Sequence, residues 1–288
     1  MIRIVFLALF FCSMLAGAFC GEDFVVFTQP STGAHLLVPI LQELTGKEGV
    51  WPAHYFEQKI CGEESFYALA EDPDYVAYLW NRCPTPKAHF QHALKSMKMK
   101  KQFMFLHAPF TLNMQSLIED SNYRVFYLRR DPRDTCISLL QHSLHFENGI
   151  IDEPWFRSLG INEQIKVVIE GTEWHNSLRH ITREFMPWEG SPVCCTVDFA
   201  KLMGPYGGEA SAEEHLAELR KIADFLGIAI KDEKLLEIFY KVYATGYTFH
   251  RGRVGMWKDF FTKEHKSLFK EELGDLLIEM GFEESSDW

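Results

Sequence analysis

The sequence lacks several features by which large classes of protein are recognised. It has no Cys-x-x-Cys pair, and only five of its seven cysteines lie beyond the first 21 residues. That pattern argues against a zinc site and against thioredoxin-type redox chemistry. The Gly-Lys-Ser/Thr of nucleotide-hydrolysing P-loops is also missing, which disfavours a nucleotide kinase or related P-loop protein. No linker is long enough to divide residues 22–288 into independent domains.

Positive charge is scarce. The 29 Lys and Arg residues are outnumbered by 40 Asp and Glu, which gives a net charge of −11. A general binder of nucleic acid or of anionic membranes needs a basic surface that releases counterions, so we expect neither partner. The lysine run from Lys95 to Lys101 is more typical of a solvated helix end than of a binding patch. Any site for a polyanion must be a local basic pocket in an acidic protein.

Residues 1–21 have the pattern of an export leader. Arg3 precedes a long apolar run, Ala16-x-Ala18 offers a cleavage site, and the first acidic residue is Glu22. The run is short for a spanning helix, which needs about 20 apolar residues. We expect a cleavable signal peptide, with an uncleaved signal anchor or a buried N-terminal segment as alternatives. The protein is then exported or in the secretory pathway, and only an uncleaved leader would attach it to a membrane.

Apolar strand-like segments alternate with helical patterns along the rest of the chain. A hydrophobic content of 47%, with 14% aromatic residues, is ample for a substantial core. Alternation of this kind predicts an α/β protein with a parallel sheet that is flanked by helices on both faces. Strands are expected at 24–27, 103–106, 123–128 and 193–197, and helices at 34–44, 163–183, 212–225 and 263–280.

The most informative segment runs from Tyr123 to Ser138. A β-branched and aromatic strand ends in Arg129 and Arg130, Asp-Pro then opens a helix, and Ser138 falls inside it. This order places guanidinium groups and a hydroxyl at the carboxyl end of a strand, beside the positive end of a helix. A phosphate is the ligand that fits this arrangement. The alternative is that Arg129 and Arg133 pair with neighbouring aspartates.

Two further segments complete a pattern. Residues 24–44 form strand, loop and helix, with Pro-Ser-Thr-Gly-Ala-His-Leu in the loop. Residues 250–262 read His-Arg-Gly-Arg-Val-Gly-Met-Trp-Lys-Asp-Phe-Phe-Thr. Together with the Arg130–Ser138 element, these segments resemble the sulfotransferase family that uses 3′-phosphoadenosine 5′-phosphosulfate. The resemblance covers essentially residues 22–283, and residues 199–227 look like bacterial members of that family.

This resemblance implies a sulfotransferase fold, described as P-loop-like, over residues 22–288 and a site for 3′-phosphoadenosine 5′-phosphosulfate without a metal. His107, at the end of a strand, resembles the catalytic base, because an imidazole can take the proton of an acceptor hydroxyl. The same family pattern assigns the 3′-phosphate to Arg130, Ser138, Arg251 and Gly252, and the 5′-phosphosulfate to Ser31, Thr32, Gly33, Ala34 and His35.

The sequence departs from the family where the sulfuryl group would lie. Ser31 occupies the position of a lysine or arginine that would neutralise the leaving group, and a protonated His35 is the one available substitute. In the late loop, His250 stands at an arginine position. Met256 replaces an aspartate, and we expect the loop to lose an anchor there.

The function expected from this pattern is transfer of a sulfuryl group to a hydroxyl- or amine-bearing acceptor. The alternative is a catalytically weakened nucleotide-binding protein of the same fold. Three further points stay open at this level. Trp257 either packs the core or stacks on adenine, the aromatic residues of 51–80 either line an acceptor pocket or fill the core, and Cys61 with Cys83 is the one pair to test as a disulfide.

Overall fold

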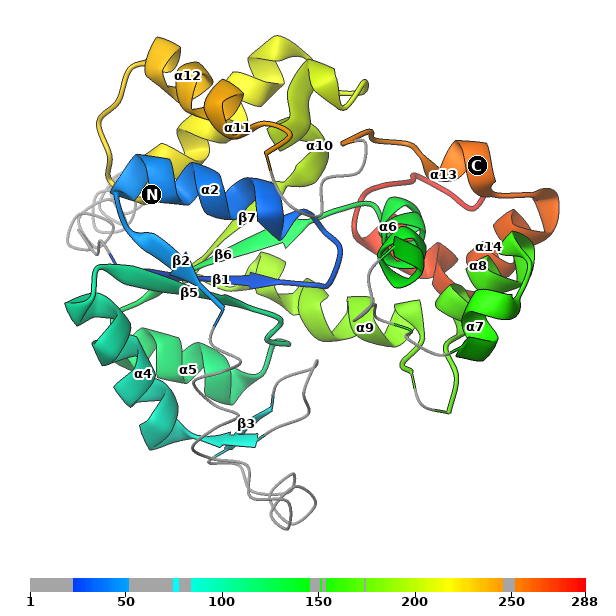
Figure 1. Ribbon diagram of the computed structural model, residues 1–288, viewed down its shortest axis with the longest axis horizontal. Helices are drawn as coiled ribbons and strands as arrows, with labels where there is room; N and C mark the ends of the chain where they lie inside the picture. Colours follow the sequence, from blue (N-terminus) through cyan, green and yellow to red (C-terminus); the bar gives the residue numbers. More distant parts are fainter. Residues whose placement is uncertain are drawn as a thin grey trace, which may run out of the picture.

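The computed structural model describes residues 23–51, 75–77, 84–145, 151, 154–173, 175–245 and 252–288. At their centre lies a parallel sheet of five strands in the order β2-β5-β1-β6-β7 (Figure 1). A separate antiparallel pair joins β3 to β4. The α/β class with a parallel sheet is confirmed. The strands are β1 Phe24–Thr28, β2 Glu48–Val50, β3 Tyr75–Ala77, β4 Pro84–Pro86, β5 Gln102–Leu106, β6 Arg124–Arg129 and β7 Cys194–Asp198.

Helices cover both faces of the sheet, as a parallel sheet requires. In Figure 1, α2, α11 and α12 lie on one face, while α4, α5 and α9 lie on the other. The helices are α2 Ala34–Thr45, α4 Lys87–Met99, α5 Leu112–Asp120, α6 Pro132–His145, α7 Pro154–Ser158, α8 Ile161–Glu170, α9 Leu178–Phe185, α10 Phe199–Met203, α11 Ala212–Phe225, α12 Asp232–Val242, α13 Trp257–Phe260 and α14 Lys263–Glu279, with short 3-10 turns at Met186–Gly190 and Gly204–Tyr206.

The alternation of side chains in β1 builds a core on each face. Phe24 and Val26 pack with residues of α2, α11 and α12, whereas Val25 and Phe27 pack with residues of α4, α5 and α9. Successive residues of a strand point to opposite faces, so one apolar strand serves both layers. All five residues of β1 are buried, so this strand contributes side chains to the apolar core on each face of the sheet.

A third apolar cluster lies beside the sheet. It joins α6 to α8 and α14 through residues such as Ile137, Ile165 and Phe269, and it includes Met256 and Trp257 of the late loop. Figure 1 shows these helices together at one side of the molecule. Trp257 therefore packs in the core, as one of the two readings of the sequence predicted.

The helix expected over 163–183 is in fact two helices, so that prediction was wrong. Helix α8 ends at Glu170, and Gly171 follows with a φ of 75°. A Cβ at Gly171 would lie 2.5 Å from the backbone nitrogen of Ser177, which begins α9 as its N-cap. Between Ile169 and Leu178 the sequence reads Glu-Gly-Thr-Glu-Trp-His-Asn-Ser, so the helical spacing of apolar residues is interrupted, and Gly171 and Ser177 are residue types that end and begin helices.

Several sequence predictions lie outside the described residues: the leader at 1–21, Cys61, Cys83 and most of the aromatic region 51–80. In the part of the chain that is described, no helix combines the length and apolarity needed to cross a bilayer.

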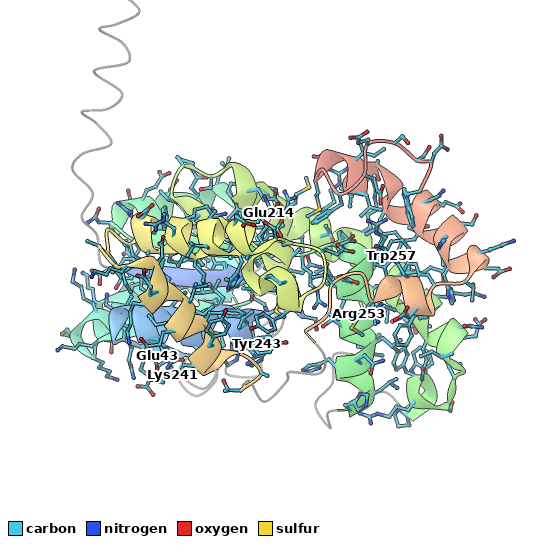
Figure 2. The ribbon with its side chains drawn as sticks, turned by 90° about the horizontal axis from the view of Figure 1, so that it is seen from above. Glu43, Glu214, Lys241, Tyr243, Arg253 and Trp257 are labelled. Atoms are coloured by element: carbon cyan, nitrogen blue, oxygen red, sulfur yellow. The ribbon has the colours of Figure 1, made fainter. Side chains whose placement is uncertain are left out.

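Surface ion pairs join elements that are distant in sequence. Lys241 of α12 lies beside Glu43 of α2, with Nζ 2.7 Å from the carboxylate (Figure 2). Arg179 of α9 binds Asp275 of α14 at 2.6 Å. Exposed pairs of this kind add little free energy, about 0 to 1 kcal/mol each, so the apolar clusters carry the fold.

Phe126 gives a direct test of that conclusion. Its ring is fully buried in β6 and contacts Phe24 and Phe225, so Phe126→Ala removes apolar contacts and leaves a cavity. We expect the free energy of unfolding to fall by about 3 to 5 kcal/mol in urea titrations. Met99→Ala, at an exposed apolar residue of α4, should change it by less than about 0.5 kcal/mol. Equal losses of unfolding free energy in the two variants would contradict the conclusion that the buried apolar clusters stabilise the fold.

Candidate active site

The register of the sheet brings the ends of three strands to one edge. Phe27 of β1 pairs with Leu106 of β5 on one side and with Tyr127 of β6 on the other. The residues that follow these strands therefore meet at the same carboxyl edge, which is where open α/β sheets bind ligands. His107 and Arg130 both lie there.

The loop between β1 and α2 presents a helix N-terminus at this edge. Thr32 is buried, and its hydroxyl donates to the carbonyl of Gln29 at 2.8 Å. Ser31 has a φ of 63°, a left-handed conformation that is uncommon for serine. Helix α2 has no side-chain cap and no acidic residue in its first turn. Its amide groups and its positive dipole end are thus available to an anion.

Gly33 allows this loop to lie close to the next layer. Its φ is 110°, and a Cβ built there would be 2.5 Å from the ring of Phe199. Any side chain at Gly33 would push Phe199 away and strain the backbone. Phe199 begins α10 directly after β7, so the loop and the far strand are in contact through this glycine.

Arg130 is the cation that reaches the loop. Its Nη1 donates to the carbonyl oxygen of Ser31 at 3.0 Å, and its guanidinium lies 4.3 Å from the ring centre of Phe199. Its Nε is buried and has no hydrogen-bond partner among the described residues. Burial lowers the pKa of Arg130, while the carboxylates of Asp134 and Asp131 oppose that shift. A buried donor on a charged group, left unpaired, fits a phosphate oxygen.

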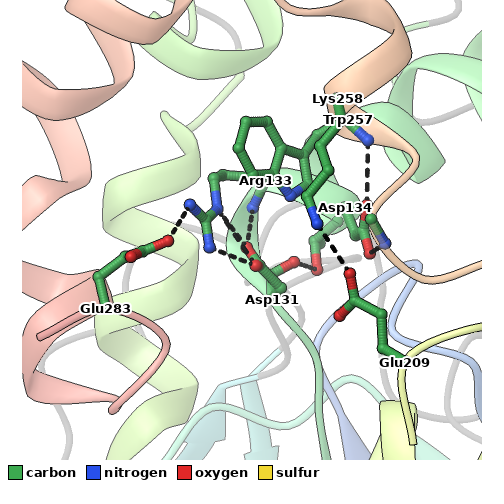
Figure 3. Close-up of polar contacts among 9 residues, drawn as sticks. Asp131, Arg133, Asp134, Glu209, Trp257, Lys258 and Glu283 are labelled. Carbon is green, nitrogen blue, oxygen red and sulfur yellow. Dashed lines mark hydrogen bonds and ion pairs between the residues drawn. The ribbon is translucent and has the colours of Figure 1, made fainter. Parts of the chain in front are cut away.

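The two neighbouring arginines are used differently. Arg129 binds Glu189 at 3.2 Å and Asp198 at 3.4 Å. Arg133 holds Asp131 with its Nε and Nη2 at 2.7 to 3.1 Å and also binds Glu283 (Figure 3). Pairing with acidic residues is therefore correct for Arg133 with Asp131, whereas Arg129 has other partners.

Of the other residues expected to bind the 3′-phosphate, Ser138 and Gly252 lie in the described part of the chain and Arg251 does not. Ser138 is half-buried on α6, about two turns after Arg130, and its hydroxyl has no hydrogen-bond partner in the described part of the chain. Gly252 has a φ of 61°, which suits glycine. Arg251 and His250 lie outside the described residues.

The late loop is anchored although Met256 stands at the expected anchoring position. Both carboxylate oxygens of Asp134 accept backbone amides, from Gly255 at 2.7 Å and from Trp257 at 3.1 Å. Met256 is itself buried in the third apolar cluster. The expectation of a lost anchor was wrong, because Asp134 supplies one from a distant helix.

His107 is held in one tautomer. Its Nδ1 lies 2.6 Å from the carbonyl oxygen of Thr28, and a carbonyl can only accept, so Nδ1 carries the proton. The lone pair is then on Nε2, the form that can accept a proton from an acceptor hydroxyl. Trp51 packs edge-on against the ring at 5.0 Å between centroids. Burial lowers the pKa of His107 to about 4, so the imidazole is neutral at pH 7.

Two further histidines lie near His107. His35 in α2 and His142 in α6 both lower the pKa of His107 through their charge. Partial burial lowers the pKa of His35 itself, which disfavours a protonated His35 as a substitute for the missing lysine. Among the described residues, no group of His, Cys, Asp or Glu side chains is placed to hold a metal ion.

The sequence matches a known family over more than half of its length. The model of the sulfotransferase domain matches residues 21–193. The chain belongs to the sulfotransferase family. No curated protein matches its sequence significantly.

Solved structures agree on the fold of this sulfotransferase-family protein. A mouse sulfotransferase, SULT7A1, complexed with PAP is 13% identical, with a TM-score of 0.55 over 88% of this chain and 86% of the other. A retinol dehydratase in complex with androsterone and the inactive cofactor PAP is 13% identical, with a TM-score of 0.56 over 89% of this chain and 80% of the other. At such identities the likeness shows the fold alone.

Two residues of this edge were not singled out from the sequence. The sequence pattern pointed to Asp134 only as one of the aspartates near Arg129 and Arg133, and to Phe199 only as the first residue of the segment 199–227. The signal for Asp134 is its place in the first turn of α6, where a carboxylate is usually solvated and stabilises the helix dipole. Its burial depends on the late loop, more than a hundred residues further along the chain.

The protonation of His107 can be measured. We expect its imidazole to titrate with a midpoint at about pH 4, because burial disfavours the charged ring. The unfolded chain takes up this proton near its ordinary pKa of about 6.5. His107 therefore contributes to loss of stability as the pH falls from about 6.5 towards about 4. Histidine NMR, assigned with His107→Gln, reports the midpoint, and a value at or above 6.5 would contradict the buried geometry.

Proposed function

We propose that this protein transfers a sulfuryl group from 3′-phosphoadenosine 5′-phosphosulfate to a hydroxyl or amine acceptor. The observation that carries the proposal is the hydrogen bond between Arg130 and the carbonyl of Ser31. It brings the expected 3′-phosphate cation and the loop at the α2 N-terminus into contact. A nucleotide with phosphates at both ends of its ribose needs these two elements side by side.

His107 supplies the acid–base chemistry in this proposal. The acceptor oxygen or nitrogen attacks sulfur, its new bond to sulfur forms, and the bond from sulfur to the phosphate oxygen breaks. The acceptor proton passes to Nε2 of His107, and adenosine 3′,5′-bisphosphate leaves with the bonding electrons. The contact between Nδ1 and Thr28 fixes the ring so that Nε2 is unprotonated at the start. Most of the remaining catalysis is positioning and electrostatic stabilisation of the leaving phosphate.

The leaving phosphate receives less charge compensation than the family pattern provides. Residues 29–35 contain no lysine or arginine, and desolvation lowers the pKa of His35, which disfavours the charged ring. The amides at the start of α2 remain as donors. Loss of one stabilising donor costs about 3 to 4 kcal/mol in the barrier, by analogy with an oxyanion hole.

A second candidate function follows from Ser31. A protein that keeps Arg130 but lacks the cation at position 31 can bind the nucleotide and transfer the sulfuryl group poorly or not at all. The absence of lysine and arginine from residues 29–35 favours this candidate, because the backbone amides at the start of α2 are then the remaining donors to the leaving phosphate.

The proposed location follows from the leader alone. We propose an exported or secretory-pathway protein, held at a membrane only if residues 1–21 are not removed. Donor nucleotide must then be supplied on the far side of a membrane.

Arg130→Ala tests the nucleotide site. We expect affinity for adenosine 3′,5′-bisphosphate to fall by about tenfold to a hundredfold or more, because charge-assisted hydrogen bonds to phosphate are lost. The measurement is the thermal shift of residues 22–288 as nucleotide is added, with calorimetry for the dissociation constant.

Arg179→Ala is the matched control. It also removes an arginine, but from an exposed ion pair with Asp275 on the far helices. We expect its nucleotide affinity to equal that of the wild type. A wild-type chain that does not bind the nucleotide, or an Arg130→Ala variant that binds it normally, would refute the proposed function.

Ser31→Lys separates the two candidate functions. If the natural protein transfers sulfuryl groups poorly because it lacks this cation, the variant should gain activity by about a hundredfold or more. If the natural protein is already an efficient enzyme, the variant should change little. Turnover with radiolabelled donor and simple phenol or amine acceptors distinguishes these results, with Ser31→Ala as a control for loss of the hydroxyl.

A further inference from the structure

Asp134 is the buried carboxylate that anchors the late loop. It lies in the first turn of α6 and only 1% of its surface is exposed. Its two oxygens each accept one backbone amide from the late loop, Gly255 on one oxygen and Trp257 on the other (Figure 3). Burial raises the pKa of this carboxyl, while Arg130 and the two amides counteract that effect.

The position of this carboxylate links two expected nucleotide ligands. Asp134 lies four residues after Arg130, which precedes α6, and its charge acts on the guanidinium in the direction that raises the pKa of Arg130. The amides that it binds lie three and five residues after Gly252. The Asp134 side chain therefore connects the segment that follows Arg130 to the loop that carries Gly252.

We propose that Asp134 is a positioning residue for the nucleotide. By holding the amides of Gly255 and Trp257, it sets the loop that begins at Gly252 against Arg130, so that both can contact the same 3′-phosphate. The inference rests on the proposed function, because it concerns the same nucleotide. Asp134 acts through the loop and through Arg130, and it does not touch the reacting atoms.

Other contacts hold the loop in the fold without Asp134. The Arg133 guanidinium lies 4.3 Å from the ring centre of Trp257. Lys258 binds Glu209 at 3.0 Å, and the amide of Val254 donates to the carbonyl of Gly207 at 2.9 Å. A variant at Asp134 should therefore keep the loop attached but change its exact placement. If Asp134 positions the loop, its substitution weakens nucleotide binding while the loop stays attached; if its role is structural, the loop detaches or the fold is lost.

The test uses Asp134→Asn in the chain from residue 22 to 288. Asparagine keeps the volume, but its amide group carries donors where the carboxylate accepted, so one loop amide loses its partner. We expect the dissociation constant for adenosine 3′,5′-bisphosphate, measured by calorimetry, to rise by about tenfold to a hundredfold. Amide hydrogen exchange should accelerate at Gly255 and Trp257 while exchange in β1 and β6 stays unchanged.

Ser177→Ala controls for a general loss of stability. Ser177 caps α9 by accepting the amide of His180 at 3.2 Å, and its loss destabilises the helix without touching either loop. We expect normal nucleotide affinity in this variant. If it loses as much affinity as Asp134→Asn, the effect is one of stability and the inference is overturned.

The remaining outcomes are distinct. Faster exchange at Gly255 and Trp257 together with unchanged nucleotide affinity overturns the positioning role but leaves the proposed function standing. A wild-type chain that does not bind the nucleotide overturns both. Where turnover is measurable, a rise in KM for the donor with a smaller change in kcat supports positioning, because binding is weakened while His107 is untouched.

Discussion

The hydrogen bond from Arg130 to the carbonyl of Ser31 is the contact on which the candidate site depends. It spans 99 positions in the sequence, and it joins the end of β6 to the loop that opens α2. Four residues later, Asp134 joins the same turn of chain to the amides of the late loop. A single turn after β6 thus fixes both loops that the family pattern associates with the nucleotide.

The three arginines around this turn, Arg129, Arg130 and Arg133, have different partners. Arg129 and Arg133 satisfy their charge with carboxylates, and Arg133 also packs between the rings of Trp257 and Trp288. Arg130 is bonded to a neutral carbonyl and retains a buried, unpaired donor. Leaving the enclosed Nε of a charged guanidinium unpaired is costly in free energy, and a bound anion would offset that cost.

At the carboxyl edge of the sheet, the surroundings of His107 differ from those of the loop before α2. His107 is neutral with its lone pair on Nε2, because the Thr28 carbonyl fixes its tautomer and burial lowers its pKa to about 4. The leaving-group side has a helix N-terminus and no lysine or arginine in residues 29–35. In the proposed reaction, His107 is thus a neutral but weakly basic proton acceptor, and little positive charge compensates the leaving phosphate. Turnover and nucleotide affinity can differ widely in such a site.

The sequence by itself determined the α/β class, the central strands, and the positions of Arg130 and His107 at strand ends. These features follow from local patterns: β-branched runs, turn residues and a helix opened by Asp-Pro. The break at Gly171 was missed although the local signals are present, a glycine that ends one helix and Ser177 that begins the next.

Only the tertiary structure decided how each of the arginines 129, 130 and 133 is paired and what anchors the late loop. The partners of Arg130, Arg133 and Asp134 include residues about a hundred or more positions away. Pairing among charges depends on distances in space and on burial, and both are set by packing of the whole sheet and its helices. No local pattern contains that information.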